Sequence, residues 1–415
     1  PLPSVGSPLK PIAMLARRFL RSKVAVVLWL WTAKGVCGIS TATTKSSLST
    51  PKLLQPFGKP SSRHHHNRNL VRSSGVRVYD DQDNEYIDGM GSLWYCQVGY
   101  GRQEIIDAVT NQLQTLTYNN FPPWSCDIAE EAASRVVQLS STPDGRAYLC
   151  TSGSEAIDTA FKIARAVAQL KNEPDRQLIV RRRRGYHGVN IGGTSAQGIS
   201  SNREGWGDLM PHFIEIDPDD IASAERIFAE HGDKIAAVVT EPVQAAGGVH
   251  PPPEGYLQRL RKLCTHHGAM LILDEVITGF GRTGNWFASQ TYNVIPDLMT
   301  FAKGATSGYQ PLGGVVASKQ VCDILEANPD YLLRHGHTFS GHTGACAACL
   351  ANIDLMEREG LVDRASSIGV RLSAGLGKIA EKGAIRSVRG VGAIWAAQLN
   401  NDDTETTVKV RDCML

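Results

Sequence analysis

An aspartate and a lysine, each at the end of an apolar run, are the residues of this sequence best placed to do chemistry. The run Met270-Leu-Ile-Leu-Asp274 ends in a carboxylate, and Asp297-Leu-Met-Thr-Phe-Ala-Lys303 ends in an amine. A buried carboxylate is costly unless it meets a cation, and the protonated ring nitrogen of a ligand would be one. A lysine at a strand end in a dry pocket has a lowered pKa and becomes a nucleophile towards carbonyl groups.

Two further motifs stand where strands are expected to end. Ser152-Gly153-Ser154-Glu155 opens a helical pattern, so its free backbone N–H groups would meet a phosphate beside the positive end of the helix dipole. The same turn also fits an ordinary helix cap with Ser154 as the capping residue. Tyr186-His187 follows another apolar run, and such an aromatic ring either stacks on a planar ligand or packs in the core.

Several of these patterns also have a simpler explanation. Asp274 with Glu275 suits a metal site or an ion pair, although no His or Cys stands at ligand spacing nearby. Lys303 could simply extend to solvent. Gly279 to Gly284 fits the dinucleotide pattern G-x-G-x-x-G. However, neither a helical pattern nor a suitably spaced acid follows it, which disfavours a dehydrogenase. Cys346-x-x-Cys349 lies in an Ala-rich helical stretch without a second pair, which favours core packing.

The elements that must position these residues alternate in type along the chain. Helical spacing is expected over residues 104–118 and over 254–267, which ends at Gly268, and two short strands are expected at 76–79 and 85–87. Strands that alternate with helices predict an α/β fold with a mostly parallel sheet covered on both faces. Ligands bind such sheets at the carboxyl ends of the strands. The main strands are expected at the apolar runs 147–150, 178–180, 236–240, 270–273 and 298–301.

Composition places the chain among ordinary globular proteins of more than one domain. Its 415 residues are 42% hydrophobic and 20% charged, with a net charge of +2. No global positive field points to nucleic acid, and Arg181 to Arg184 is interpreted as a solvated strand end because no aromatic residues interleave it. Nine cysteines without framework spacing suit a reducing compartment. No apolar run reaches the length of a membrane span.

The N-terminal region differs from the rest in charge. Residues 1–79 contain thirteen Lys and Arg but no Asp or Glu. Such a segment suits a mitochondrial leader, and unrelated upstream sequence or a secretory signal with Val24 to Trp31 as its core remain alternatives. The localisation is therefore expected to be cytoplasmic or the mitochondrial matrix. His64 to His66 cannot share one helix face, which favours a solvated linker over a metal site.

Taken in order, these motifs resemble the class III, or omega-amino-acid, aminotransferases of pyridoxal phosphate (PLP) fold type I. The order is a Gly-Ser turn, an aromatic residue, a strand-end Asp and then a Lys 29 residues later. The similarity extends from about Gly75 to Ala396, and Asp274 to Gly284 is highly specific to the family. The motif Leu93-Trp94 followed by Gly99-Tyr-Gly-Arg102 looks most like the pyruvate-using omega-transaminases.

The resemblance implies a role for each matching position. Lys303 would bind PLP covalently and shuttle a proton, and Asp274 would pair with the pyridine nitrogen. Val276 and Tyr186 would enclose the ring, with His187 and Glu241 close to it. Gly153 and Ser154 would hold the phosphate, joined by Thr338 from the partner subunit of a homodimer. Trp94 and Arg389 would bind substrate, which would be an amine or amino acid and a keto acid.

The resemblance also implies domains and leaves rival functions open. Residues 1–68 would be a leader or disordered segment, 69–105 part of a small domain, 106–330 the PLP-binding large domain and 331–415 the rest of the small domain. Family members continue beyond the position of Leu415, so we expect a truncated C-terminal part. Ile157, Thr343 and Gln398 depart from the family pattern of Asn, Pro and Glu. A PLP-dependent aminomutase or racemase, or a truncated PLP-binding pseudoenzyme, would share the same cofactor residues.

Overall fold

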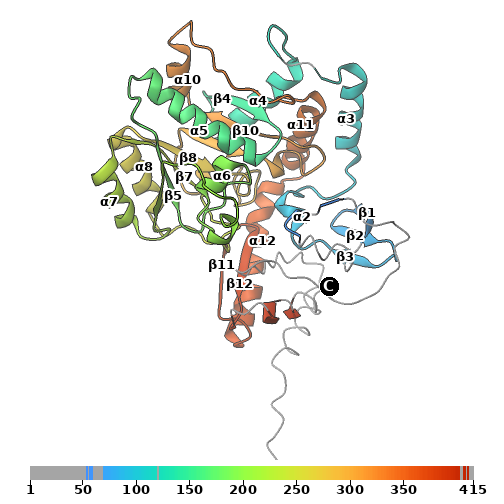
Figure 1. Cartoon of the computed structure of the whole chain (residues 1–415). Helices are drawn as coiled ribbons and strands as arrows, with labels where there is room; N and C mark the ends of the chain where they lie inside the picture. The colour runs from blue at the N-terminus through green and yellow to red at the C-terminus, as the bar shows by residue number, and fades with distance from the viewer. Residues whose placement is uncertain are drawn as a thin grey trace, which may run out of the picture.

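A computed structural model describes residues 53–54, 56–58, 69–118, 121–401, 405–407 and 409–410. The predicted leader and the three consecutive histidines therefore lie almost entirely outside the described residues. Figure 1 shows a large body around a central sheet, with a smaller sheet and a long helix beneath it.

The large body is built on a seven-stranded sheet in the order β4-β10-β9-β8-β7-β5-β6. Among the described strands of this sheet, β10 alone runs antiparallel to its neighbours. All five main predicted strands are confirmed, and β6 and β10 complete the sheet. The bounds are β4 Arg146–Cys150, β5 Leu178–Arg182, β6 Phe213–Ile216, β7 Ile235–Thr240, β8 Met270–Asp274, β9 Leu298–Phe301 and β10 Gly313–Ala317.

Helices cover both faces of the sheet because its strands are apolar on both faces. Alternate side chains of a strand point to opposite faces. Ile272 thus packs in one core beside α5 (Gly153–Leu170), whereas Leu271 and Leu273 pack in another beside α7 (Ile221–His231) and α8 (Tyr256–His267). The predicted helix at 254–267 is α8, and it ends at Gly268 with a left-handed φ of 70°.

A third core joins the sheet to the helices near α3 (Gln103–Thr115), the helix expected at 104–118. It contains α4 (Asp127–Leu139) and α11 (Thr343–Arg358), and it encloses Cys346 and Cys349, which confirms their interpretation as core residues. The remaining short helices of this body are α6 (Ile191–Ala196), η2 (Ser200–Asn202), α9 (Ala288–Thr291), η3 (Lys303–Ala305) and α10 (Lys319–Glu326).

The smaller elements lie at the two ends of the described chain. β1 (Leu70–Ser74), β2 (Arg77–Asp80) and β3 (Glu85–Ile87) form an antiparallel sheet that includes both short predicted strands, and α2 (Gly91–Trp94) follows it. The long helix α12 (Leu361–Glu381) leads to the hairpin of β11 (Ser387–Val391) and β12 (Ile394–Gln398). The domain boundaries given above stay predictions.

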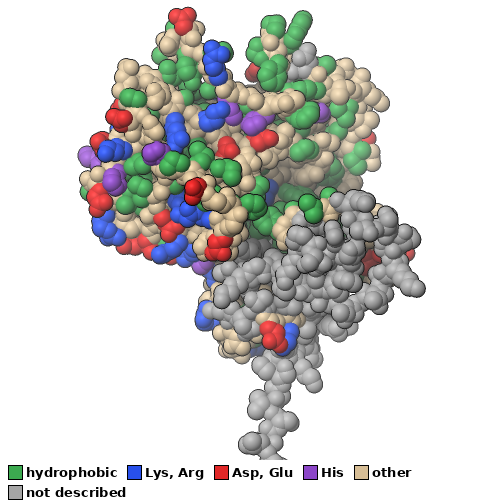
Figure 2. Space-filling view, in the orientation of Figure 1, with side chains coloured by type: hydrophobic (Ala, Val, Ile, Leu, Met, Phe, Trp, Pro, Cys, Tyr) green, Lys and Arg blue, Asp and Glu red, His purple; other side chains and the backbone are tan. Residues whose placement is uncertain are grey.

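The surface carries charges of both signs. On the face in Figure 2, acidic and basic side chains are interspersed over the large body. In the part of the chain that the structure describes, no helix combines the length and apolarity that a membrane crossing requires.

The arginine run at the end of β5 corrects one interpretation. Arg181 and Arg182 are buried rather than solvated, with 6% and 1% of their surface exposed. Arg182 donates to the Pro218 carbonyl and the Thr240 hydroxyl, and its guanidinium lies 4.5 Å from the centre of the Tyr256 ring. Buried guanidinium groups need such acceptors, which the sequence pattern of the run did not reveal.

Candidate active site

A small hollow of about 110 Å³ lies where the carboxyl ends of β5, β7, β8 and β9 meet. This is the edge of the sheet at which a ligand was expected. Most of the predicted cofactor residues contribute to its wall, although they lie far apart in the sequence. The lining residues are Gly153, Ser154, Tyr186, His187, Gly188, Glu241, Val243, Asp274, Val276, Ile277, Thr278, Ala302 and Lys303.

The Asp274 carboxylate is buried and held in one orientation by three neighbours. Its Oδ1 accepts hydrogen bonds from the Thr300 hydroxyl at 3.0 Å and from the Val276 backbone at 3.2 Å. Its Oδ2 lies 2.8 Å from His187 Nδ1. Because a carboxylate only accepts, His187 carries a proton on Nδ1. The carboxylate is therefore aligned before any ligand arrives.

The Lys303 amine is enclosed by protein but has no hydrogen-bond or ion-pair partner among the described residues. Burial lowers the pKa of Lys303, and Arg282 adds to this effect, while Asp274 and Glu241 oppose it. The residue has a left-handed φ of 44°, which costs a non-glycine residue about 1–3 kcal/mol. Backbone strain of this kind is common at functional sites. Here the strained residue is the first residue of η3, so its φ sets the direction in which the Lys303 side chain leaves the backbone.

The Gly-Ser turn opens α5, as predicted, but its capping residue is not Ser154. Ser152 caps the helix by accepting from the Glu155 backbone at 3.2 Å. The Ser154 hydroxyl instead accepts from the Val189 backbone at 3.0 Å. The first-turn N–H groups of Gly153 and Ser154 therefore remain available to an anion.

Close packing explains two glycines at this turn. A Cβ on Gly153 would lie 2.9 Å from both γ carbons of Val276, and a Cβ on Gly188 would lie 2.5 Å from Ser154 Oγ. Gly188 also has a φ of 90°, which L side chains rarely adopt. Both positions therefore need glycine to keep the hollow open.

Glu241 ties the Tyr186 segment to the end of β7. One of its oxygens accepts from the Tyr186 backbone at 2.9 Å and the other from the Ala245 backbone at 3.1 Å. Full burial, aided by the negative charge of Asp274, raises the pKa of Glu241 to about 7. Glu275 is also buried, but Ala288, Ser289 and Thr278 donate to its oxygens, so it serves the start of α9 rather than the hollow.

Three predicted site residues lie outside the wall of this hollow. The centre of the buried Trp94 ring lies 6.0 Å from Lys303 Nζ, close enough to border a substrate. Arg389 donates to the Gly248 carbonyl at 2.7 Å and to Gln398 at 3.3 Å. Thr338 is exposed, and its carbonyl accepts from the Tyr118 hydroxyl. The structure thus brings Trp94 to the site but not Arg389 or Thr338 of the same chain.

The residues present fit pyridoxal phosphate. The unpaired Lys303 amine at the wall of the hollow offers a group that bonds to an aldehyde, and the aligned Asp274 carboxylate offers a partner to a protonated ring nitrogen. The free N–H groups at the start of α5 suit a phosphate. Within the described residues, no group of three His, Cys, Asp or Glu is arranged to hold a metal ion.

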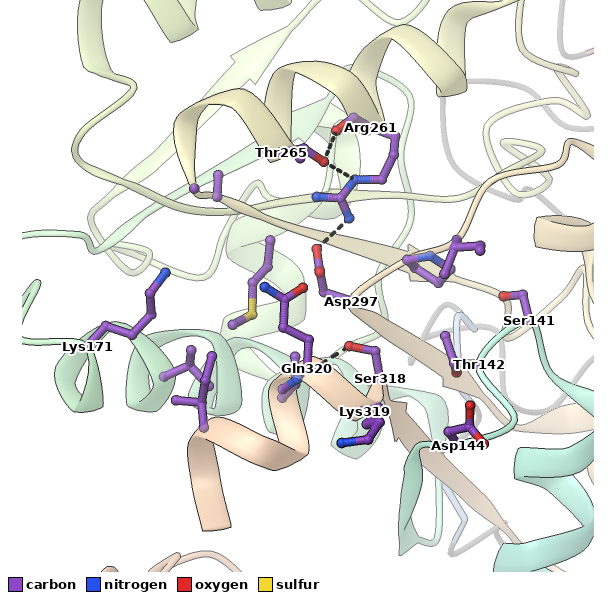
Figure 3. Close-up of a pocket in the computed structure, with 18 of the residues that line it drawn as sticks. Ser141, Thr142, Asp144, Lys171, Arg261, Thr265, Asp297, Ser318, Lys319 and Gln320 are labelled. Atoms are coloured by element: carbon purple, nitrogen blue, oxygen red, sulfur yellow. Dashed lines mark hydrogen bonds and ion pairs between the residues drawn. The ribbon is translucent and has the colours of Figure 1, made fainter. Parts of the chain in front are cut away.

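A larger hollow of about 590 Å³ lies at the opposite edge of the sheet (Figure 3). It borders the amino ends of β8 and β9, where ligands of such sheets do not usually bind. Several of its charged side chains also have partners within the chain: Arg261 pairs with Asp297 at 2.5 Å and Lys319 with Asp323 at 2.7 Å. We therefore place the active site in the smaller hollow.

Two residues that the sequence analysis did not single out matter to the site. Thr300 supports Asp274 because the parallel pairing of β8 and β9 sets the two residues side by side. Arg282 is buried at 7% exposure and donates to the Trp94 carbonyl at 2.8 Å. The register of β8 against β9 would have revealed the contact of Thr300 with Asp274, but this register cannot be predicted from one sequence.

Comparison with known proteins identifies close relatives of this architecture. Residues 59–413 match the family model of the class-III aminotransferases. The chain is 35% identical over 364 residues to a beta-alanine–pyruvate aminotransferase of Pseudomonas aeruginosa, covering 82% of this chain and 81% of the relative. It is 36% identical over 359 residues to a taurine–pyruvate aminotransferase of Bilophila wadsworthia, covering 80% and 77%.

The fold is similar to solved structures as well. A PLP-bound amine transaminase from an uncultivated Pseudomonas species superposes with a TM-score of 0.80. The two chains are 33% identical, and the match covers 86% of each.

Proposed function

Because the chain belongs to the class-III aminotransferases, which use pyridoxal phosphate, we propose that it moves an amino group from an omega-amino acid or amine to pyruvate. The observation that carries this proposal is the unpaired Lys303 amine facing the same hollow as the Asp274 carboxylate. The relatives named for beta-alanine and taurine are both named as using pyruvate, and the motif Leu93-Trp94 followed by Gly99-Tyr-Gly-Arg102 resembles the pyruvate-using omega-transaminases.

The chemistry divides between the cofactor and the chain. When bound, pyridoxal phosphate supplies the carbonyl that takes up an amine and the ring that accepts the electrons released at the substrate carbon. Burial lowers the pKa of the Lys303 amine. This favours the uncharged form, which can bond to the carbonyl carbon with loss of water and can later accept and return a proton. Lys303 is thus both the attachment point and the acid–base group.

The other side chains fix orientation and charge. Thr300 and the Val276 backbone direct the Asp274 carboxylate, which would keep the ring nitrogen protonated. His187 donates to the same carboxylate and secures it from the second side. We propose that Trp94, close to Lys303, borders the substrate.

We further propose a homodimer as the active unit, because an apolar face is exposed beside the segment that carries Thr338. This apolar face consists of Leu116, Phe121, Trp124, Leu332 and Phe339, which are 41–66% exposed. Contiguous exposed apolar patches mark protein interfaces. Tyr118 packs 6.1 Å from Phe339 and holds the Thr338 carbonyl. A second copy on this face would receive Thr338 near its own phosphate-binding turn.

The test combines covalent trapping with a substrate screen. Borohydride should fix pyridoxal phosphate to Lys303, and peptide mapping should locate the label there. Beta-alanine, taurine and simple amines are then offered with pyruvate or 2-oxoglutarate, and alanine or glutamate is measured. We expect alanine to form with pyruvate, and Lys303→Ala to abolish both the label and turnover.

Each result has a defined meaning. A label on another lysine would refute the assignment of Lys303. Turnover of an amino acid without any keto acid would indicate an aminomutase or racemase. Labelling without turnover for any donor would indicate a PLP-binding pseudoenzyme.

A further inference from the structure

The segment that carries Thr338 forms neither a helix nor a strand, and it presents two sets of side chains. Along residues 331–338, alternate side chains are half-buried and exposed. His335 and His337 point inward, whereas Arg334 and Thr338 are exposed. Because Thr338 directly follows His337 and is close in sequence to His335, whatever anchors these two histidines also limits where Thr338 is presented.

His335 is bound on both sides of its ring by helix α5. Its Nε2 lies 2.7 Å from the Thr159 hydroxyl, and its Nδ1 lies 2.9 Å from Lys162 Nζ. The single Thr159 hydroxyl proton is already donated to the Glu155 carbonyl at 2.7 Å. His335 Nε2 must therefore donate to Thr159, and Nδ1 must accept from the Lys162 ammonium. This arrangement requires the neutral imidazole tautomer that carries its proton on Nε2.

Neighbouring rings support this arrangement. The Tyr148 ring stacks on His335 with centres 5.3 Å apart, and its hydroxyl lies 3.2 Å from Ser340 Oγ. His337 Nδ1 lies 3.8 Å from Glu155 Oε1. Burial, reinforced by the positive charges of Lys162 and His337, lowers the pKa of His335 to about 4. The ring is accordingly neutral near pH 7, as the hydrogen bonds require.

We propose that His335 is a positioning residue that ties the segment 331–338 to α5 and so sets Thr338 for the phosphate site of the partner subunit. The inference rests on the proposed dimeric enzyme. The contact of His335 with α5 lies wholly within one subunit, whereas the phosphate site that it serves belongs to the other subunit. Helix α5 then has two tasks, since its first turn binds the phosphate of its own subunit while Thr159 and Lys162 hold the segment that serves the other.

Hybrid dimers test this assignment because they separate the two subunits. One subunit carries Lys303→Ala and cannot be labelled, so borohydride fixation reports only on the intact site of the other. His335→Phe keeps a ring for Tyr148 but removes both hydrogen bonds. It is placed either on the Lys303→Ala subunit or on the intact subunit. The measurement is the concentration of pyridoxal phosphate that half-saturates labelling at Lys303.

We expect a large effect only when His335→Phe lies on the Lys303→Ala subunit. Hydrogen bonds to charged groups are among the stronger ones in proteins, so half-saturation should need about tenfold more pyridoxal phosphate. With the substitution on the intact subunit, the value should stay within about twofold of the unmodified hybrid. His335→Gln, which can replace both bonds with its amide, should recover part of the loss. The control His231→Phe changes a half-exposed histidine of α7 and should have no effect in either position.

Other outcomes overturn the proposal in distinguishable ways. Equal losses in both arrangements would show that His335 only supports the fold. A loss confined to the intact subunit would show that the segment serves its own site, and no loss would show that Thr338 does not depend on His335. If the unmodified hybrid does not form or does not label at Lys303, the proposed dimeric enzyme fails, and this inference fails with it.

Discussion

Asp274 shows how much of a catalytic position depends on neighbours that are distant in the sequence. Its location at a strand end was predicted, but its orientation depends on Thr300 from the next strand and on His187 from the end of β5. Asp274 ends β8, Thr300 lies in β9 and His187 follows β5, so the three side chains come from different strands at the same end of the sheet. A charge that is already aligned needs no reorganisation during the reaction, which is how buried charges contribute most to catalysis.

Asp274→Asn should bind the cofactor but react slowly. Asn has nearly the same shape and can still accept from Thr300, so the fold and the phosphate turn should persist. The lost charge removes the proposed partner of the protonated ring nitrogen. We expect single-turnover reaction with an amine to slow at least ~100-fold, or about 2.7 kcal/mol. As a control, Thr300→Val keeps the charge and should slow it far less. A rate for Asp274→Asn within a few-fold of the parent would rule out Asp274 as the nitrogen partner.

The buried carboxyl of Glu241 should make stability depend on pH. Its pKa is about 7 in the folded chain against an ordinary value of 4.5. The folded state therefore binds this proton more tightly, and the resulting stability is complete below pH 4.5 and lost as the pH rises through 7. A pKa difference of this size corresponds to about 3 kcal/mol.

Glu241→Gln should remove that dependence because the amide is neutral at every pH. The measurement is the free energy of unfolding of the cofactor-free protein in denaturant between pH 4.5 and 8. The parent should lose stability relative to Glu241→Gln as the pH rises, and Glu230→Gln at an exposed position of α7 should behave like the parent. Parallel curves for the parent and Glu241→Gln would contradict the raised pKa.

The sequence pointed to the candidate reacting residues but not to the residues that hold them in place. Lys303 and Asp274 stand out because a charged residue ends an apolar run, a pattern that is local. Arg282 and Thr300 look unremarkable in the chain, and their contacts depend on strand register and on the fold of the Trp94 segment. A charged residue at the end of an apolar run can thus be recognised in one sequence, whereas the side chains that hold it in place cannot.

At the level of elements, the start of α5 and the end of β8 determine the width of the hollow. Gly153→Ala would place a methyl group against Val276, and overpacking of this kind costs about 1–3 kcal/mol. We expect about tenfold weaker binding of pyridoxal phosphate, measured by titration of bound cofactor. In a Val276→Ala background the same substitution should cost much less. Additive effects of the two substitutions would show that this contact does not set the width.

Element prediction succeeded where apolar runs were continuous and failed where they were short or interrupted. The buried parallel strands of the core were predicted because parallel strands covered on both faces are apolar throughout. β10 begins with Gly313 and Gly314 and runs antiparallel between β4 and β9. A Cβ on Gly314 would lie 2.4 Å from the Tyr148 carbonyl, so the close approach of neighbouring strands, not strand propensity, explains these residues.

At the scale of the whole molecule, the exposed apolar face and the segment 331–338 lie together. A Cβ added to Gly336 would lie 3.4 Å from the Phe121 ring, and the Phe339 and Tyr118 ring centres are 6.1 Å apart. The alternating exposure of the segment has a simple explanation if its exposed side chains meet a second copy of the chain. Dimerisation and cofactor retention should then depend on the same surface.

Phe339→Asp tests that dependence. The phenylalanine is 56% exposed in the single chain, so the substitution should leave the fold of the subunit intact while placing a charge in the apolar interface. Sedimentation velocity should show a monomer, and pyridoxal phosphate should bind at least ~10-fold more weakly, because the phosphate would lose the proposed contribution of Thr338 from a second copy. Val370→Asp is a matched control, since this valine is 72% exposed on α12 outside the apolar face. It should stay dimeric and retain its cofactor. A Phe339→Asp monomer that binds cofactor as tightly as the parent would show that each subunit holds its own phosphate unaided.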